Sequence, residues 1–231
     1  MLGIIVQLII SWILLKLIEK KDLAVLGFTP TKQRLKDFAT GFLIAVVFVA
    51  AYWLAVSFIT KNTYKLNPDY TIKDFSIATW YVIKSVSFEE LIFRGALLYI
   101  LINRLRATKA LIISAVGFGI YHWFSYGILG QPVNMIFIFL VTGIMGYMYA
   151  LAYQKTQSLY LPFALHFGYN FTTMVIFSAN KGIGLQLLTK TVEGDTLYKS
   201  YFAWLLMTII SAIGFPLVTY LYLRTKNQEI K

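Results

Sequence analysis

The chain has 231 residues, of which 58% are hydrophobic and only 13% are charged. A water-soluble domain of this length rarely has so little polar surface, and the apolar residues form runs of about 17–25 residues, long enough to cross a bilayer. The absence of cysteine excludes disulfides, thiolate nucleophiles and Cys-ligated metals. The net charge of +11 is typical of basic residues flanking membrane spans, and no basic face favours nucleic-acid binding. We therefore expect a multi-pass cell-membrane protein, with the lipid bilayer as its solvent and no nucleic-acid partner.

Seven apolar segments predict an all-α transmembrane helix bundle that forms a single domain over residues 1–231. The expected spans are Leu2–Ile18, Phe38–Ile59, Phe75–Ile102, Ala110–Phe124, Val133–Tyr153, Leu159–Ala179 and Tyr201–Leu223. The first span runs directly into charged residues and lacks a small-residue cleavage site, so we expect a retained anchor and not a signal peptide. Gly143 and Gly146 in the fifth span predict close packing against another helix.

Lysine and arginine concentrate in alternate connections between the spans. The connections after the first, third, fifth and seventh spans carry Lys20, Lys21, Lys32, Arg34, Lys36, Arg104, Arg106, Lys109, Lys155, Arg224, Lys226 and Lys231. The lysines of the opposite side are partly offset by acidic residues. Because cytoplasmic loops carry the excess of basic residues, we expect the carboxyl terminus in the cytoplasm and the amino terminus outside.

Three ionisable residues, Glu89, Glu90 and Arg94, lie near the middle of the third span. A charge inside a bilayer costs about 2.5–3.5 kcal/mol on insertion scales, so their presence needs a reason. One interpretation is structural, since Glu90 and Arg94 are four residues apart and can form an ion pair on one helix face. Glu89 is turned by about 100° from Glu90. Because one arginine cannot easily neutralise both carboxylates, Glu89 is the better candidate for an acid or base.

Both histidines of the chain, His122 and His166, lie in apolar spans, and Asn170 follows His166 by one helical turn on the same face. A single membrane histidine often serves only packing. Counting about 1.5 Å per residue, however, puts Glu89 about 22 Å, His122 about 20 Å and His166 about 14 Å from the predicted cytoplasmic ends. The three side chains can therefore converge, and we expect a site between spans three, four and six.

These residues support two hydrolytic chemistries. Glu89, His122 and His166 could ligate one divalent metal such as Zn²⁺ and leave a position for water. Without a metal, Glu89 could take the proton of an attacking water while an imidazole or Asn170 orients the water or stabilises an oxyanion. The spacing does not match the His-Glu-x-x-His motif of soluble zinc proteases, so both routes stay open.

The same residues follow a known pattern of three motifs. Glu89-Glu90-x-x-x-Arg94, Phe118-x-x-x-His122 and His166-x-x-x-Asn170, in this order, resemble those of the CPBP (CAAX protease and bacteriocin-processing, or Abi) membrane peptidases over about Phe75–Ala179. The resemblance implies an intramembrane endopeptidase with a peptidase core at residues 75–179. In that core Glu89 activates water, His122, His166 and Asn170 complete the site, and Glu90 and Arg94 support it. The family has been described both as metalloproteases and as metal-free glutamate proteases, and the lack of cysteine with only two histidines slightly favours the glutamate type.

The resemblance also implies a membrane-associated peptide or protein as the substrate. Some members cleave prenylated CAAX proteins, and others are linked to bacteriocin self-immunity, peptide-pheromone maturation or surface-protein display. The small size and compact loops look bacterial, which favours a bacteriocin-related or peptide-maturation role over CAAX processing. Two other readings stay open. One is a non-catalytic immunity or scaffold protein, and the other is a proton-coupled transporter, which the lack of an inverted repeat disfavours.

Overall fold

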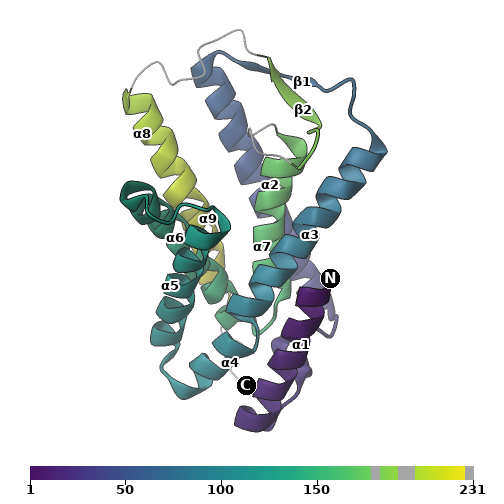
Figure 1. The fold of residues 1–231 in the computed structure, drawn as a ribbon, viewed down its shortest axis with the longest axis vertical. Helices are drawn as coiled ribbons and strands as arrows, with labels where there is room; N and C mark the ends of the chain where they lie inside the picture. The colour runs from purple at the N-terminus through teal and green to yellow at the C-terminus, as the bar shows by residue number, and fades with distance from the viewer. Residues whose placement is uncertain (178–182, 192–200, 227–231) are drawn as a thin grey trace.

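The computed structural model describes residues 1–177, 183–191 and 201–226, and it is a bundle of helices (Figure 1). The α-helices are α1 (Leu2–Leu14), α2 (Lys32–Thr60), α3 (Ile72–Arg94), α4 (Ala96–Arg104), α5 (Ala107–Ser125), α6 (Pro132–Thr156), α7 (Tyr160–Phe171), α8 (Tyr201–Ile209) and α9 (Phe215–Arg224). Short helical turns of other pitch are η1 (Leu15–Glu19), η2 (Leu23–Leu26), η3 (Thr172–Ile176) and η4 (Ile210–Gly214). The predicted all-α architecture is confirmed.

Four helical stretches of the described residues are long and apolar enough to cross a membrane. They are Leu2–Glu19, Lys32–Thr60, Pro132–Thr156 and Leu205–Arg224, and they correspond to the first, second, fifth and seventh predicted spans. The other three predicted spans correspond to α3 with α4, α5, and α7 with η3, which are shorter or more polar. The last residues of the sixth predicted span, 178 and 179, lie outside the described residues.

The third predicted span is bent at Gly95. The prediction of one continuous helix over Phe75–Ile102 is wrong, because α3 ends at Arg94 and α4 begins at Ala96. A Cβ at Gly95 would lie 2.2 Å from the carbonyl oxygen of Leu91, so the bend requires glycine. The last carbonyls of a helix have no intrahelical partner, and here the Ser114 hydroxyl of α5 donates to the Phe93 carbonyl at 2.9 Å.

The connections expected on the cytoplasmic side meet at one end of the bundle, the lower end in Figure 1. The Leu159 amide, after α6, donates to the Leu26 carbonyl at 3.3 Å, and the Ser158 hydroxyl donates to the Gly27 carbonyl at 3.2 Å. Gly27 has a φ of 77°, and a Cβ there would lie 2.7 Å from the Gln157 carbonyl oxygen. The α1–α2 turn therefore needs a glycine both for its backbone conformation and for its close approach to the α6–α7 turn.

Two ion pairs tie further connections to this end. Arg104 of α4 donates from Nε to Glu19 at 2.9 Å, and Lys226, after α9, bonds to Asp37 of α2, which is only 3% exposed. Partial burial alone would lower the pKa of Lys226, but its hydrogen bonds to Asp37 and Tyr222 raise the pKa above its ordinary value. Lys226 is therefore protonated at physiological pH, and the basic connections lie together as the alternation of charge predicts.

At the other end, two polar connections form a small sheet (Figure 1). Strand β1 (Thr63–Leu66) pairs antiparallel with β2 (Leu188–Thr191), with Thr63 opposite Thr191. Phe177 bridges to Leu188, so the sheet is attached to the end of η3. The sequence predicted only helices, and the sheet adds a cap above α7.

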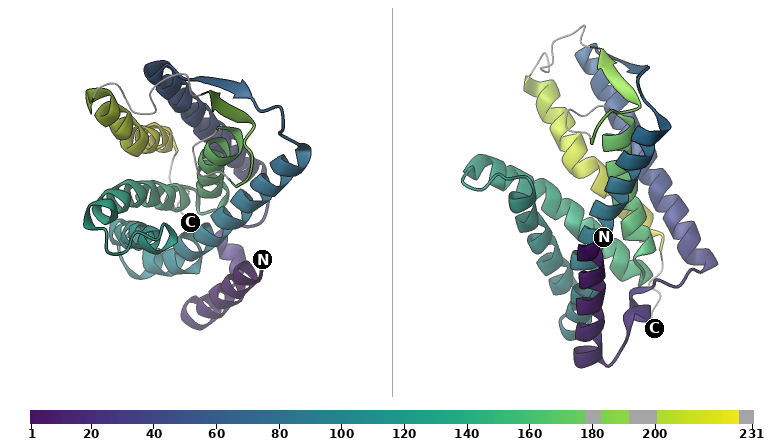
Figure 2. Two further views of the ribbon diagram at one scale, coloured as in Figure 1. Left: turned by 45° about the horizontal axis from the view of Figure 1, so that its top comes forward. Right: turned by 45° about the vertical axis from the view of Figure 1, so that its right-hand side comes forward.

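Helix α7 lies at the centre of the bundle, against α2, α3 and α6 (Figure 2). Gly168 allows α2 to approach, because a Cβ there would lie 2.8 Å from Ala45 Cβ and 3.0 Å from the Phe42 carbonyl oxygen. This close packing fixes the helix that carries His166.

Helices α5 and α6 pack along their lengths. Gly143 and Gly146, which were predicted to allow close packing, differ in how much space surrounds them. A Cβ at Gly146 would lie 2.9 Å from Phe118 Cβ, whereas a Cβ at Gly143 would have its nearest neighbour, the Ala115 carbonyl oxygen, at 3.7 Å. The expected close packing is therefore confirmed at Gly146, while Gly143 has room for a methyl group.

We predict that Gly146→Ala destabilises the protein by about 1–3 kcal/mol, because the added methyl group must displace Phe118. The control is Gly143→Ala, one turn earlier on the same helix, which should leave stability unchanged or raise it by up to about 1 kcal/mol. Thermal unfolding in detergent measures both, and equal midpoints for the two variants would contradict this account of the α5–α6 interface.

Candidate active site

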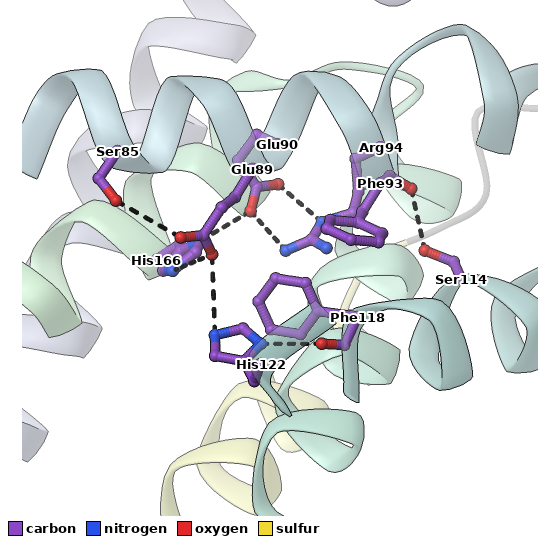
Figure 3. A network of polar contacts seen from close by, with 9 residues as sticks. All are labelled: Ser85, Glu89, Glu90, Phe93, Arg94, Ser114, Phe118, His122 and His166. Carbon is purple, nitrogen blue, oxygen red and sulfur yellow. Dashed lines mark hydrogen bonds and ion pairs between the residues drawn. The ribbon is translucent and has the colours of Figure 1, made fainter. Parts of the chain in front are cut away.

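Helix α3 carries two buried carboxylates at consecutive positions, and one of them is held by arginine. Glu90 is 2% exposed and accepts hydrogen bonds from Arg94 Nε at 2.8 Å and from an Arg94 terminal nitrogen at 2.5 Å (Figure 3). Arg94 itself is fully buried. The predicted ion pair between Glu90 and Arg94 is confirmed, and its two-pronged geometry is the one that a guanidinium makes best.

Aromatic rings enclose the Arg94 guanidinium. Its central carbon lies 4.5 Å from the centre of the Phe118 ring and 5.1 Å from that of Tyr149. The faces of these rings attract a cation, which compensates for part of the hydration that Arg94 loses. Helices α5 and α6 thereby stabilise the charge that α3 brings into the bundle.

His166 of α7 completes this buried network. Its Nδ1 lies 2.8 Å from Glu90 Oε1, and because a carboxylate accepts, Nδ1 carries the proton. The ring also stacks on Tyr149, with centroids 4.7 Å apart and planes 17° apart. Nε2 of the neutral imidazole is therefore an acceptor in a fixed orientation.

His122 of α5 is oriented in the same way by a backbone group. Its Nδ1 donates to the Phe118 carbonyl at 2.8 Å, and its ring contacts the Phe118 ring edge to face with centroids 4.5 Å apart. The Nε2 of His122 is thus also left as an acceptor when the imidazole is neutral.

Both Nε2 atoms face Glu89, whose side chain points away from Arg94 (Figure 3). Glu89 Oε2 lies 3.9 Å from His122 Nε2 and 3.7 Å from His166 Nε2. The Ser85 hydroxyl donates to Glu89 Oε1 at 3.4 Å, and no described residue donates to the buried Oε2. The two acidic residues thus differ, as expected, with Glu90 neutralised by Arg94 and Glu89 facing the histidines.

These groups line one cavity of about 360 Å³, which also contains Asn170. Asn170 lines the same cavity, and within the described part of the chain it forms no hydrogen bond to the charged cluster. The rest of the wall is mainly apolar or phenolic, and its tyrosines are Tyr81, Tyr121, Tyr126, Tyr149 and Tyr169. All six predicted site residues therefore belong to this cavity or to the ion pair behind it.

The arrangement does not fit a metal ion. Among the described residues, no group of three or more His, Asp or Glu has a geometry that could hold a metal. We therefore derive the chemistry from the side chains alone.

Three contributions to the site were missed by the sequence analysis. Ser85 precedes Glu89 by four residues on the same helix, so the helical spacing could have identified it. The hydrogen bond from His166 to Glu90 and the stacking of Tyr149 join different helices, and no pattern within one helix indicates them.

The comparison with known families locates the same region. Residues 71–172 match the family model described as Type II CAAX prenyl endopeptidase Rce1-like. The chain carries a domain of this protease family. The CPBP resemblance is thereby confirmed, and the Rce1-like domain extends from the residue that caps α3 to the start of η3, with all six site residues inside it. No curated protein and no solved structure matches the chain. Members of this family are multi-pass membrane endopeptidases, which agrees with the long apolar helices of this chain.

We predict that Arg94→Met destabilises the Rce1-like domain by about 3–5 kcal/mol, because Glu90 would remain buried without its cation. The control is Arg104→Met, which removes a 59% exposed arginine paired with Glu19 and should cost no more than about 1 kcal/mol. Unfolding followed by tryptophan fluorescence in detergent compares the two. A loss for Arg94→Met as small as that of the control would contradict the structural role of the pair.

Proposed function

We propose that the protein is an intramembrane endopeptidase that hydrolyses a peptide bond of a membrane-associated peptide or protein. Residues 75–179 would be its peptidase core within a single domain of seven spans. The observation that carries the proposal is the approach of Glu89 Oε2 to the Nε2 atoms of His122 and His166, at 3.9 and 3.7 Å, inside a cavity. In this reading Glu89 is the general base.

The hydrogen-bonding capacity of these three facing atoms supports a water molecule bound to them. Glu89 Oε2 and the two Nε2 atoms are all acceptors when the carboxyl group is ionised and the imidazoles are neutral. One water can donate to two of them, so the third acceptor is satisfied if the site carries one additional proton. A site with one water and one shared proton holds both reactants that amide hydrolysis needs, a nucleophile and an acid for the leaving amine.

The reaction follows from these roles. Glu89 takes a proton from the water as its oxygen attacks the scissile carbonyl carbon, and a protonated imidazole or the Asn170 amide donates to the oxyanion. The carbon–nitrogen bond then breaks, and the proton held at Glu89 or an imidazole passes to the amine. The Glu90–Arg94 pair keeps the orientation of His166 through the 2.8 Å hydrogen bond, so Glu90 acts as a positioning residue.

The cavity wall favours an uncharged substrate segment. Apart from Glu89 and the two histidines, the described residues of the lining have apolar, hydroxyl and amide side chains, and none of them is a lysine or arginine that could meet an acidic residue. This fits an apolar peptide held at the membrane. We propose peptide maturation or a bacteriocin-related role, and the CAAX prenyl endopeptidase description of the matching family makes a prenylated CAAX peptide the second substrate to test.

We predict that Glu89→Gln lowers the cleavage rate by about 10²–10⁴-fold, because the amide cannot accept the proton of water. Glu19→Gln removes a carboxylate at the end of η1 and should leave the rate within about twofold, since it alters only a partly exposed ion pair. Cleavage is measured in liposomes with an apolar membrane-anchored peptide and a prenylated CAAX peptide. A fully active, folded Glu89→Gln protein would rule out the base assignment, whereas no cleavage of either peptide by the unaltered protein would favour a non-catalytic scaffold.

We also predict that a chelator leaves the cleavage rate unchanged, because no group of three His, Asp or Glu side chains among the described residues is arranged to hold a metal ion. Cleavage after exhaustive chelation, with metal content determined on the same sample, provides the measurement. Loss of cleavage that added Zn²⁺ restores would refute the metal-free mechanism.

A further inference from the structure

Helix α3 carries a further ionisable residue, Lys84, which neither the buried ion pair nor the candidate active site uses. Lys84 lies five residues before Glu89 and is partly buried. Its ammonium group forms neither an ion pair nor a hydrogen bond with any other residue that the structure describes. An unpaired ionisable group in a membrane helix is costly, so its presence indicates a function.

Lys84 lines a hollow between α1 and α3, which lie side by side (Figure 1). The hollow has a volume of about 340 Å³, and its other lining residues are Met1, Gly3, Ile4, Tyr81, Ser85 and Phe88. These have apolar or hydroxyl side chains, so among the described residues of the wall the charge comes from Lys84 alone. Such a wall suits an uncharged chain that carries one negative group at Lys84.

Two residues of α3 join this hollow to the cavity that contains Glu89. Tyr81 and Ser85 line both spaces. The Ser85 hydroxyl donates to Glu89 Oε1 at 3.4 Å (Figure 3), whereas its neighbour Lys84 lines the hollow. Tyr81 is 44% exposed, so the boundary is open on its outer side. A peptide bound at Glu89 can therefore continue across Tyr81 and Ser85 to Lys84 without crossing a helix.

The spacing along α3 sets the distance between the two groups. Five residues of helix separate Lys84 from Glu89 by about 7.5 Å along the axis. An extended peptide covers about 3.3–3.6 Å per residue, and the four-carbon stem of lysine adds its own reach. A negative group about two to four residues from the scissile bond is therefore within range of Lys84.

We propose that Lys84 is a specificity-determining residue, which binds a carboxylate of the substrate about two to four residues from the scissile bond. This rests on the proposed function, because it assigns the hollow to the same peptide substrate. A carboxylate is the anion that an unmodified peptide carries, either at its free carboxyl terminus or on an Asp or Glu side chain, and both pair with an ammonium group. The cavity at Glu89 takes the uncharged part of the segment, and Lys84 takes the charge.

Binding of three synthetic peptides tests the site without cleavage. All share one short apolar sequence and a neutral fluorophore; the first has a free carboxyl terminus, the second a terminal amide, and the third a terminal amide with a glutamate beside it. Fluorescence anisotropy with the full Glu89→Gln chain in detergent measures their affinities. We expect the free carboxylate to bind about 10–100-fold more tightly than the uncharged amide, as for a charged hydrogen bond.

The glutamate peptide distinguishes the two sources of the carboxylate. An affinity equal to that of the free carboxylate would support a site for any carboxylate. An affinity as low as that of the uncharged amide, with the free carboxylate still preferred, would support a site for the chain terminus. Equal binding of all three peptides would overturn the proposal.

Substitution tests the residue itself. Lys84→Met removes the charge and should lower the affinity for the free carboxylate about 10–100-fold, while the uncharged amide changes by less than about twofold. Lys84→Arg should keep the preference. The control is Lys73→Met, which removes an exposed lysine at the start of the same helix, outside both spaces, and should change neither affinity. An equal loss for all peptides in Lys84→Met would overturn the carboxylate site and indicate a structural or lipid-anchoring lysine. The comparison among peptides holds even if Lys84→Met does not fold.

Cleavage separates this proposal from the proposed function. With Glu89 present, the free carboxylate peptide should have a lower KM than the amide, and Lys84→Met should raise that KM with kcat within about threefold, because binding common to ground and transition state is lost. Preferential binding of the carboxylate without cleavage of any peptide would contradict the peptidase and support the site at Lys84. Cleavage of both peptides with equal KM would overturn the site and leave the peptidase in place.

Discussion

The buried hydrogen bonds among Arg94, Glu90 and His166 are the constraint on which the site depends. A charge in the bundle interior is tolerated only with its partner, so α3 and α7 must meet in one register, and the rings of Phe118 and Tyr149 bring α5 and α6 to the same point. One ion pair thereby sets the relative positions of four helices. Glu89 gains a fixed place without a salt bridge to arginine, which leaves its carboxylate available for chemistry.

The orientation of the two histidines follows one rule. Each imidazole donates a hydrogen bond from Nδ1 to a group that can only accept, a carbonyl for His122 and a carboxylate for His166. Each ring therefore turns its Nε2 toward Glu89. The partner of His122 lies within its own helix, α5, whereas the partner of His166 is Glu90 of α3, the neighbour of Glu89. The resulting cluster is rigid on one side and open to the cavity on the other.

Much of this was predictable from the sequence because lipid makes polar residues conspicuous. Glu89, Glu90, Arg94, His122, His166 and Asn170 stood out against apolar spans, and i,i+4 spacing identified the Glu90–Arg94 pair. The contacts between helices could not be predicted, since Tyr149 and the Glu90–His166 bond depend on packing that no single span encodes. The bend at Gly95 was missed because apolar residues continue on both sides of it, and the small sheet because its strands are four residues long and far apart in the chain.

The bend at Gly95 has a consequence for how this region can vary among relatives. A helix that ends inside lipid leaves carbonyls that water cannot reach, and here the hydroxyl of Ser114 serves the one at Phe93. A relative whose third helix ran straight would need neither the glycine nor the hydroxyl. Positions 95 and 114 should therefore covary, with glycine at the first accompanied by a small hydroxyl residue at the second.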